Sequence, residues 1–177
     1  LAIHPEFITN PLKKFVYISY IYSYDSASVF NAQCKFFKNR LVRFTYNTGT
    51  NRLESPVSLC DTLPGGNDHN SQRMIIAPVG GTDYLFYASG DMGAGQLNCA
   101  ARAMKAQQLN SYEGKILRFN LEPDGDAGLN AWIPSAGANA NPFNATLGVQ
   151  SAVWVNGIRN NQGFAYDPVL DKLYGSS

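Results

Sequence analysis

A short unit recurs along this chain of 177 residues: a proline, a tight turn and a strand-like run that carries a tyrosine. It extends from Pro5 to Tyr17, from Pro78 to Tyr87 and from Pro168 to Tyr174, and a related Leu-x-Arg-Phe pattern recurs at residues 41–44 and 116–119. Repeated antiparallel units are typical of β-propellers, in which each blade is a four-stranded sheet. The repeat therefore predicts an all-β chain made of propeller blades.

The length of the chain limits how many blades it can hold. At roughly 40 to 50 residues per blade, about two to three blades fit, whereas a closed propeller has about 4 to 8. We therefore expect residues 1–177 to be a fragment of a single β-propeller domain whose chain extends beyond both ends. A β-sandwich is the alternative architecture.

Runs rich in aromatic and β-branched residues predict the individual strands. They are expected at residues 15–22, 40–46, 73–77, 83–88, 114–121, 152–155, 164–168 and 171–174. Residues 23–38 are expected to form a long connecting loop, and residues 97–109 a short helix or an ordered loop. Residues 122–149, rich in Gly, Ala, Asn and Pro, are expected to form a long surface loop held down by Trp132 and Phe143.

Charge and hydropathy exclude several classes of protein. The 14 basic and 13 acidic residues leave a net charge of +1, which offers no electrostatic footprint for nucleic acid or an anionic membrane. No run of about 18 apolar residues is present, so no membrane span is expected. Cys34, Cys60 and Cys99 form no metal-binding or haem-attachment pattern. The sequence leaves two alternatives for these cysteines: one disulfide with a leftover thiol, or three reduced thiols.

The residues that favour chemistry are concentrated in the polar loop 65–73. It contains Asp68 and His69, which bring a carboxylate and a titratable base next to each other. A second polar loop, residues 90–96, supplies Asp91, which could orient the His69 imidazole. The structural alternative is an ordinary surface turn. Met92 and Met104 are expected to be packing residues, and His4 is given no functional role.

A set of short motifs, in this order along the chain, resembles the soluble quinoprotein glucose/sorbosone dehydrogenase family. They are Leu1-Ala2-Ile3-His4-Pro5-Glu6-Phe7, Pro64-Gly65-Gly66-Asn67-Asp68-His69, Gly90-Asp91, Gly114-Lys115-Ile116-Leu117-Arg118, Asn141-Pro142-Phe143 and Gly157-Ile158-Arg159-Asn160-Asn161-Gln162-Gly163-Phe164-Ala165. The resemblance spans essentially the whole chain. It implies a six-bladed propeller, of which this chain is a part.

The resemblance also implies an activity: oxidation of the anomeric carbon of an aldose to a lactone with pyrroloquinoline quinone (PQQ) as the cofactor. It gives His69 the role of general base and Asp91 that of orienting the imidazole. It places Asp68 and Gln96 in the sugar pocket, and Arg159 with Asn160 at the quinone oxygens. An imidazole suits proton abstraction near neutrality, and a cation suits the charge that builds on a reduced quinone.

The chain departs from the family pattern at two places. Ile158 and Asn161 flank the Arg-Asn pair where the family commonly has His and Pro, and Ser71-Gln72 replaces a Gly-Gly pair. These changes put substrate preference in doubt. The calcium ligands and the basic residues that clamp the cofactor in the family have no counterpart in residues 1–177, so the isolated fragment is expected to be inactive. The resemblance further implies an external electron acceptor, a periplasmic or secreted location and a possible homodimer.

Two other functions stay open. A non-catalytic propeller that binds a protein partner, as in the Hedgehog-interacting proteins, looks similar in this region, but it would be free to lose the base. A calcium-dependent lactonase on a propeller would need a central cluster of Asp, Asn and Glu ligands, which these residues do not supply.

Overall fold

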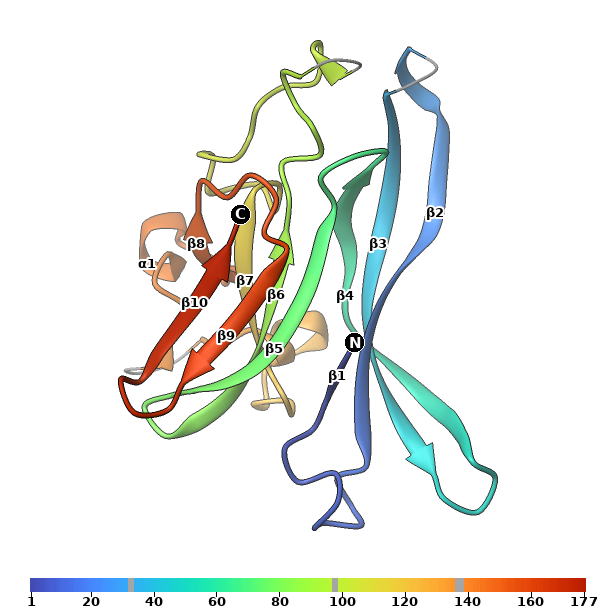
Figure 1. The fold of residues 1–177 in the computed structure, drawn as a ribbon, viewed down its shortest axis with the longest axis vertical. Coiled ribbons are helices and arrows are strands. Elements are labelled where there is room, and N and C mark those ends of the chain that lie inside the picture. Colours follow the sequence, from blue (N-terminus) through green and yellow to red (C-terminus); the bar gives the residue numbers. More distant parts are fainter. Residues whose placement is uncertain (32–33, 97–98, 136–138) are drawn as a thin grey trace.

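The structure, a computed structural model, describes residues 1–31, 34–96, 99–135 and 139–177, with the backbone alone for residues 23–31 and 34. Two four-stranded antiparallel sheets and one hairpin make up the fold (Figure 1). The first sheet contains, in spatial order, β1 (Ala2–Ile3), β2 (Phe15–Asn31), β3 (Cys34–Asn47) and β4 (Arg52–Gly66). The second contains β5 (Ser71–Val79), β6 (Thr82–Ser89), β7 (Lys115–Asn120) and β8 (Val153–Asn156), and the hairpin pairs β9 (Gly163–Asp167) with β10 (Lys172–Ser176).

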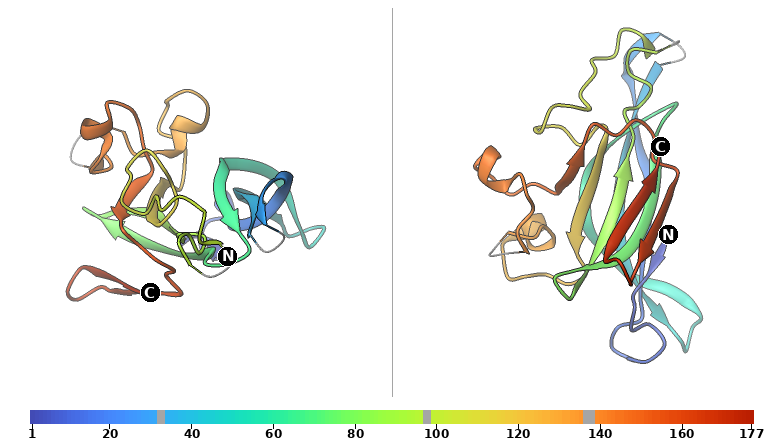
Figure 2. Two further views of the ribbon diagram at one scale, coloured as in Figure 1. Left: turned by 90° about the horizontal axis from the view of Figure 1, so that it is seen from above. Right: turned by 60° about the vertical axis from the view of Figure 1, so that its left-hand side comes forward.

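This arrangement confirms the expected fold class: two propeller blades followed by the first hairpin of a third. Strand order follows chain order within each sheet, as in the blades of a propeller. The two sheets and the hairpin form successive layers when the molecule is turned (Figure 2).

Strand β6 shows why the layers stack. Successive side chains of a strand point to opposite faces, so an apolar run can pack against a layer on each side. Leu85 and Tyr87 belong to a core cluster between the two sheets, whereas Tyr84, Phe86 and Ala88 pack on the side of the C-terminal hairpin. All five are at most 5% exposed.

The cluster between the sheets draws on both blades. Tyr17, Leu41 and Leu63 of the first sheet are completely buried against Leu117 and Phe119 of the second. The Tyr17 hydroxyl also donates a hydrogen bond to the carbonyl of Leu121, 3.1 Å away. This contact ties the first blade to the end of β7.

The expected loop over residues 23–38 is wrong, because most of it continues β2 and β3 as a long paired ribbon. The register shifts between Ile21 and Ser23 and again between Asp25 and Val29. Such bulges interrupt the alternation of apolar and polar residues on which the expectation rested. Residues 32 and 33 lie outside the described part of the chain.

Strand β4 was not expected from the sequence. It contains Pro56 and Pro64, which lack the N–H group that a central strand needs. The strand lies at the edge of its sheet, next to β3 alone, where a missing donor is tolerated.

The remaining strand expectations are confirmed, and the described parts of the two irregular segments form ordered loops. Residues 100–109 form turns joined by irregular backbone, so the ordered-loop alternative holds over most of the described part of 97–109. The long loop after β7 contains a 3-10 turn, η2 (Gly128–Trp132), and one helical turn, α1 (Asn144–Leu147). Trp132 is buried in the core and Phe143 packs against it, as expected.

The cysteines follow the single-bridge alternative. Cys60 is a free, buried thiol, and Cys99 is disulfide-bonded. Within the described ranges, no helix has both the length and the apolar character needed to cross a bilayer.

Candidate functional site

Three connections meet at one end of the sheets, the upper end in Figure 1: residues 67–70 after β4, the described residues of 90–114 after β6 and residues 157–162 after β8. Backbone hydrogen bonds join them. The amide of Asp91 donates to the carbonyl of Arg159 at 2.8 Å, and that of Ile158 donates to Gly114 at 3.0 Å. The candidate site is built on these three joined loops.

His69 and Asp91 form the centre of the site. Nδ1 of His69 lies 2.8 Å from Oδ1 of Asp91, and the two side chains are 14% and 15% exposed. A carboxylate can only accept, so a neutral His69 carries its proton on Nδ1 and has a free lone pair on Nε2. The amide of Gly93 donates to the same Asp91 oxygen at 3.0 Å and helps to hold the carboxylate in place.

The backbone around the pair adopts left-handed conformations, which non-glycine residues rarely adopt. His69, Ser71 and Met92 have φ angles of 49°, 58° and 61°. Non-glycine residues in this region carry strain and cluster at functional sites. Asn70 holds the turn by accepting a hydrogen bond from the Gly66 amide at 2.9 Å and donating one to its carbonyl at 2.7 Å.

Asp91, Gln96 and Arg159 line one hollow of about 360 Å³. The Arg159 guanidinium donates to Oε1 of Gln96 at 2.5 Å, so residues 63 positions apart in the sequence form one polar wall. The structure therefore brings together four of the predicted site residues: His69, Asp91, Gln96 and Arg159. Asp91 joins them, because it contacts His69 and also lines the hollow with Gln96 and Arg159.

Asp68 and Asn160 lie at the edges of this group. The Asp68 side chain is 62% exposed, and its Oδ2 is 3.8 Å from Nε2 of His69, beside the free lone pair. Asn160 does not line the hollow. Its Oδ1 accepts hydrogen bonds from Ser71 Oγ at 3.1 Å and Gln162 Nε2 at 2.8 Å, which leaves its NH2 group as the available donor.

The sequence analysis missed the residues that form the apolar side of the hollow. Met104, Ala106, Gly157 and Ile158 complete its lining together with Ala94 and Gly95 of the loop 90–96. Met104 was expected to be a packing residue, but it is 73% exposed, whereas Met92 is completely buried as expected. A methionine on a loop without apolar periodicity carries no signal that separates a pocket wall from a core.

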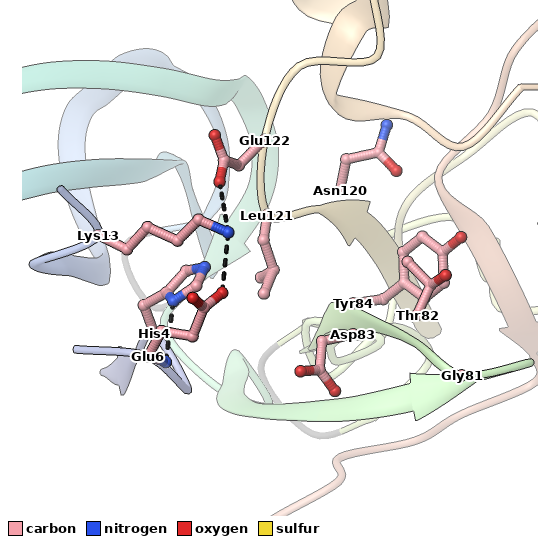
Figure 3. A pocket seen from close by; sticks show the side chains of 10 residues that line it. All are labelled: His4, Glu6, Lys13, Gly81, Thr82, Asp83, Tyr84, Asn120, Leu121 and Glu122. Carbon is pink, nitrogen blue, oxygen red and sulfur yellow. Dashed lines mark hydrogen bonds and ion pairs between the residues drawn. The ribbon is translucent and has the colours of Figure 1, made fainter. Parts of the chain in front are cut away.

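A second cavity, of about 370 Å³, lies between the first blade and the turn joining β5 to β6 (Figure 3). There Nδ1 of His4 accepts a hydrogen bond from the Glu6 amide at 3.1 Å, and Lys13 bridges Glu6 at 2.8 Å and Glu122 at 3.3 Å. Burial, followed by the charge of Lys13, lowers the pKa of His4. These contacts make His4 part of the turn between β1 and β2. Among the described residues, no group of three or more His, Cys, Asp and Glu side chains could hold a metal ion.

Stacked four-stranded sheets with a polar histidine–carboxylate site on the loops at one end define a β-propeller protein. The family model for glucose/sorbosone dehydrogenases matches residues 1–177. This chain belongs to the glucose/sorbosone dehydrogenase family.

Curated relatives agree with this family. The chain is 34% identical over 180 residues to quinoprotein glucose dehydrogenase B of Acinetobacter calcoaceticus, a match covering 94% of this chain and 32% of that protein. It is 29% identical to an uncharacterized protein of Synechocystis sp., with coverage of 99% and 37%. The chain thus spans about a third of the length of the curated relatives that it matches.

Solved structures share the fold. The apo form of the soluble aldose sugar dehydrogenase of Escherichia coli superposes with a TM-score of 0.64 at 21% identity, covering 98% of this chain and 41% of that one. A glucose dehydrogenase superposes with a TM-score of 0.66 at 20% identity, covering 98% and 44%.

Proposed function

We propose that this chain carries the general base and part of the cofactor pocket of a PQQ-dependent dehydrogenase that oxidises the anomeric carbon of an aldose to a lactone. Membership in the glucose/sorbosone dehydrogenase family supports sugar oxidation, and the Acinetobacter relative is named a quinoprotein. The observation that carries the proposal is the 2.8 Å contact between Nδ1 of His69 and Oδ1 of Asp91.

In this proposal, Nε2 of His69 accepts the proton of the C1 hydroxyl group. Asp91 keeps the proton of the neutral ring on Nδ1, so the lone pair is always presented at Nε2. When Nε2 takes the substrate proton, the imidazolium that forms faces the Asp91 carboxylate. The low exposure of both side chains strengthens this attraction, because little water screens it.

Asp68 and Gln96 are proposed to hold the sugar. Asp68 lies beside the free nitrogen of His69, and its exposed carboxylate can accept hydrogen bonds from sugar hydroxyls. Gln96 offers an amide on the wall of the hollow. Together these two contacts would fix which hydroxyl meets Nε2.

The residues present fit a quinone cofactor. The Arg159 guanidinium lies in the wall of the hollow, and the NH2 group of Asn160 adds a donor on the same segment. A guanidinium and amides are the groups that bind quinone oxygens and carboxylates. When bound, PQQ supplies an acceptor for the hydride that leaves C1, and Arg159 would stabilise the negative charge that this transfer creates.

We propose further features of the whole protein, of which the first rests on the share of the relatives that the chain covers. Residues 1–177 are part of a single propeller domain whose other blades complete the cofactor site, so the isolated fragment is inactive. Calcium is held by ligands outside residues 1–177. An external molecule accepts the electrons. The whole enzyme acts in the periplasm or outside the cell, with a homodimer as a possible assembly.

The experiment uses the full-length protein reconstituted with PQQ and calcium, with aldoses as substrates and a dye as electron acceptor. His69→Ala is expected to lower kcat by about 10²- to 10⁴-fold while PQQ binding is retained. His4→Asn is the matched control, because His4 is the other histidine of the chain and lies away from the hollow. Full activity of His69→Ala would refute the proposed base. No turnover of any aldose by the unsubstituted protein would favour the protein-binding alternative.

A further inference from the structure

Lys115, the first residue of β7, is a buried cation that the proposed mechanism does not use. Its exposure is 0%, which is rare for a lysine. Its Nζ donates to three backbone carbonyls: Ala106 at 2.7 Å, Glu113 at 2.7 Å and Lys105 at 3.0 Å. All three belong to the connection 90–114, which also carries Asp91 and Gln96.

The carbonyl of Ala106 has a second partner. The amide of Gly157 donates to it at 2.9 Å, so one oxygen joins the Lys115 ammonium to the segment that carries Arg159. Gly157 has a φ of 79°, and a Cβ there would lie 2.8 Å from Gln107. The two segments are therefore in close contact at this point.

Neighbouring contacts make this junction rigid. Gly114 has no room for a side chain, because a Cβ would lie 2.5 Å from that of Ala106. Glu113 pairs with Arg102 at 3.0 Å, with both side chains at most 7% exposed. The same loop is thus anchored by a second buried cation, a few residues from Ala106.

We infer that Lys115 is a positioning residue for the candidate site: it fixes Ala106, and through the Ala106 carbonyl it sets where the Arg159 segment lies relative to Gln96. Ala106, Gly157 and Arg159 line the hollow, so a shift at this junction changes the pocket itself. Lys115 itself does not line the hollow. This inference rests on the proposed function where it concerns the binding of PQQ and aldose. The inferred contact between the two segments does not depend on that function.

Arg118 provides a matched control. It is also a completely buried cation of β7, but its Nε donates to Asn141 at 2.7 Å and a terminal nitrogen donates to the carbonyl of Asn139. It therefore anchors the long loop after β7 and makes no contact with the hollow. Loss of Arg118 and loss of Lys115 both remove a buried charge that holds a loop.

The test compares Lys115→Met with Arg118→Met in the full-length holoenzyme. Lys115→Met is expected to raise the PQQ dissociation constant and the KM for the aldose by about tenfold each, which corresponds to the loss of one buried hydrogen-bonded contact. The kcat at saturation should stay within about threefold, because the His69–Asp91 pair is held by other contacts. Arg118→Met should leave both constants within about twofold at a similar loss of thermal stability.

Two results would overturn the inference: unchanged constants in Lys115→Met, or equal changes in both variants. If Lys115→Met fails to fold, Lys115→Gln, which keeps a donor, is measured in the same way. Hydrogen exchange of the unsubstituted protein is an independent readout. The Gly157 amide should exchange slowly despite its loop position, because it donates to the Ala106 carbonyl that Lys115 holds. Rapid exchange would contradict the inference. If the unsubstituted protein oxidises no aldose but this amide is protected, the proposed function is wrong, whereas the inferred role of Lys115 in fixing the two segments is retained.

Discussion

Gly90 lies directly against the backbone of His69. A Cβ at position 90 would be 1.6 Å from the carbonyl oxygen of His69 and 3.1 Å from that of Arg159. Contact this close is possible for glycine alone. The glycine therefore lets the loop that carries Asp91 reach both the histidine and the arginine segment.

The first prediction follows from this contact. Gly90→Ala forces the His69 backbone away from Asp91, which should lower the free energy of unfolding by about 1–3 kcal/mol and kcat by about a hundredfold. Urea unfolding and dye-linked kinetics measure the two effects. Gly49→Ala, on an exposed turn where a Cβ would meet only Asn47 at 3.3 Å, should change stability by less than about 0.5 kcal/mol. Equal effects at both glycines would contradict the prediction.

The second prediction concerns Asp91. In Asp91→Asn, Oδ1 can still accept from Nδ1 of His69, but the negative charge is lost. Hydrogen bonds to charged groups contribute about 1.5–3 kcal/mol, so kcat should fall by about 10- to 100-fold. Asp91→Ala, which removes the oxygen as well, should cost more. Steady-state kinetics on the reconstituted enzyme decide it, and an Asn variant slower than the Ala variant would be inconsistent with this account.

The third prediction concerns alkaline pH. Burial raises the pKa of Cys60 from 9 in its unperturbed state to about 11. Because the folded state holds this proton more tightly, its stabilising contribution is complete below pH 9 and is lost as the pH rises to about 11. The free energy of unfolding should drop by about 3 kcal/mol across that window. Burial also raises the pKa of Tyr17 and Tyr87, which adds to the loss above pH 10.

Cys60→Ala provides the control for this titration. Denaturant unfolding at intervals between pH 8 and 11 should show a shallower decline in the variant. In the native protein at pH 8, the Cys60 thiol should resist alkylation, as followed by peptide mass spectrometry, because a buried protonated thiol is a poor nucleophile. Rapid native alkylation would show that the thiol is accessible.

The fourth prediction concerns Asn141. Its side chain accepts from Arg118 Nε at 2.7 Å and donates to the carbonyl of Ser151 at 2.8 Å, with both Asn141 and Arg118 nearly inaccessible. Burial lowers the pKa of Arg118 to about 10. Asn141→Ala leaves that buried charge short of an acceptor and should cost about 3–5 kcal/mol in urea unfolding. Asn144→Ala, at a half-buried position of the same loop, should cost less.

Much of the fold could be predicted because most strands are continuous runs of apolar residues. The run Tyr84–Ala88 consists of three aromatic residues, a leucine and an alanine, so an apolar strand was evident. The ribbon formed by β2 and β3 was missed because bulges near Ser23 and Val29 disrupt alternation. Strand β4 was missed because its two prolines argue against a strand. At a sheet edge, however, the missing N–H groups are tolerated.

The site could be predicted only in part, for a related reason. His69 and Asp91 stand out as polar residues in glycine-rich turns, and their contact was expected. Arg159 and Gln96 became candidates only through the family resemblance, and their direct contact was not expected, since no local pattern links residues so far apart. Lys115 gave no usable signal, because an isolated lysine beside an apolar strand usually faces solvent.

The turn between β3 and β4 closes the sheet at the end away from the site, where Asn47 accepts hydrogen bonds from the amides of Gly49 and Thr50. Its tip is exposed and makes few ties to the core. A chemical linker attached at position 48 would therefore hold the protein on an electrode or bead with its candidate site facing away from that surface.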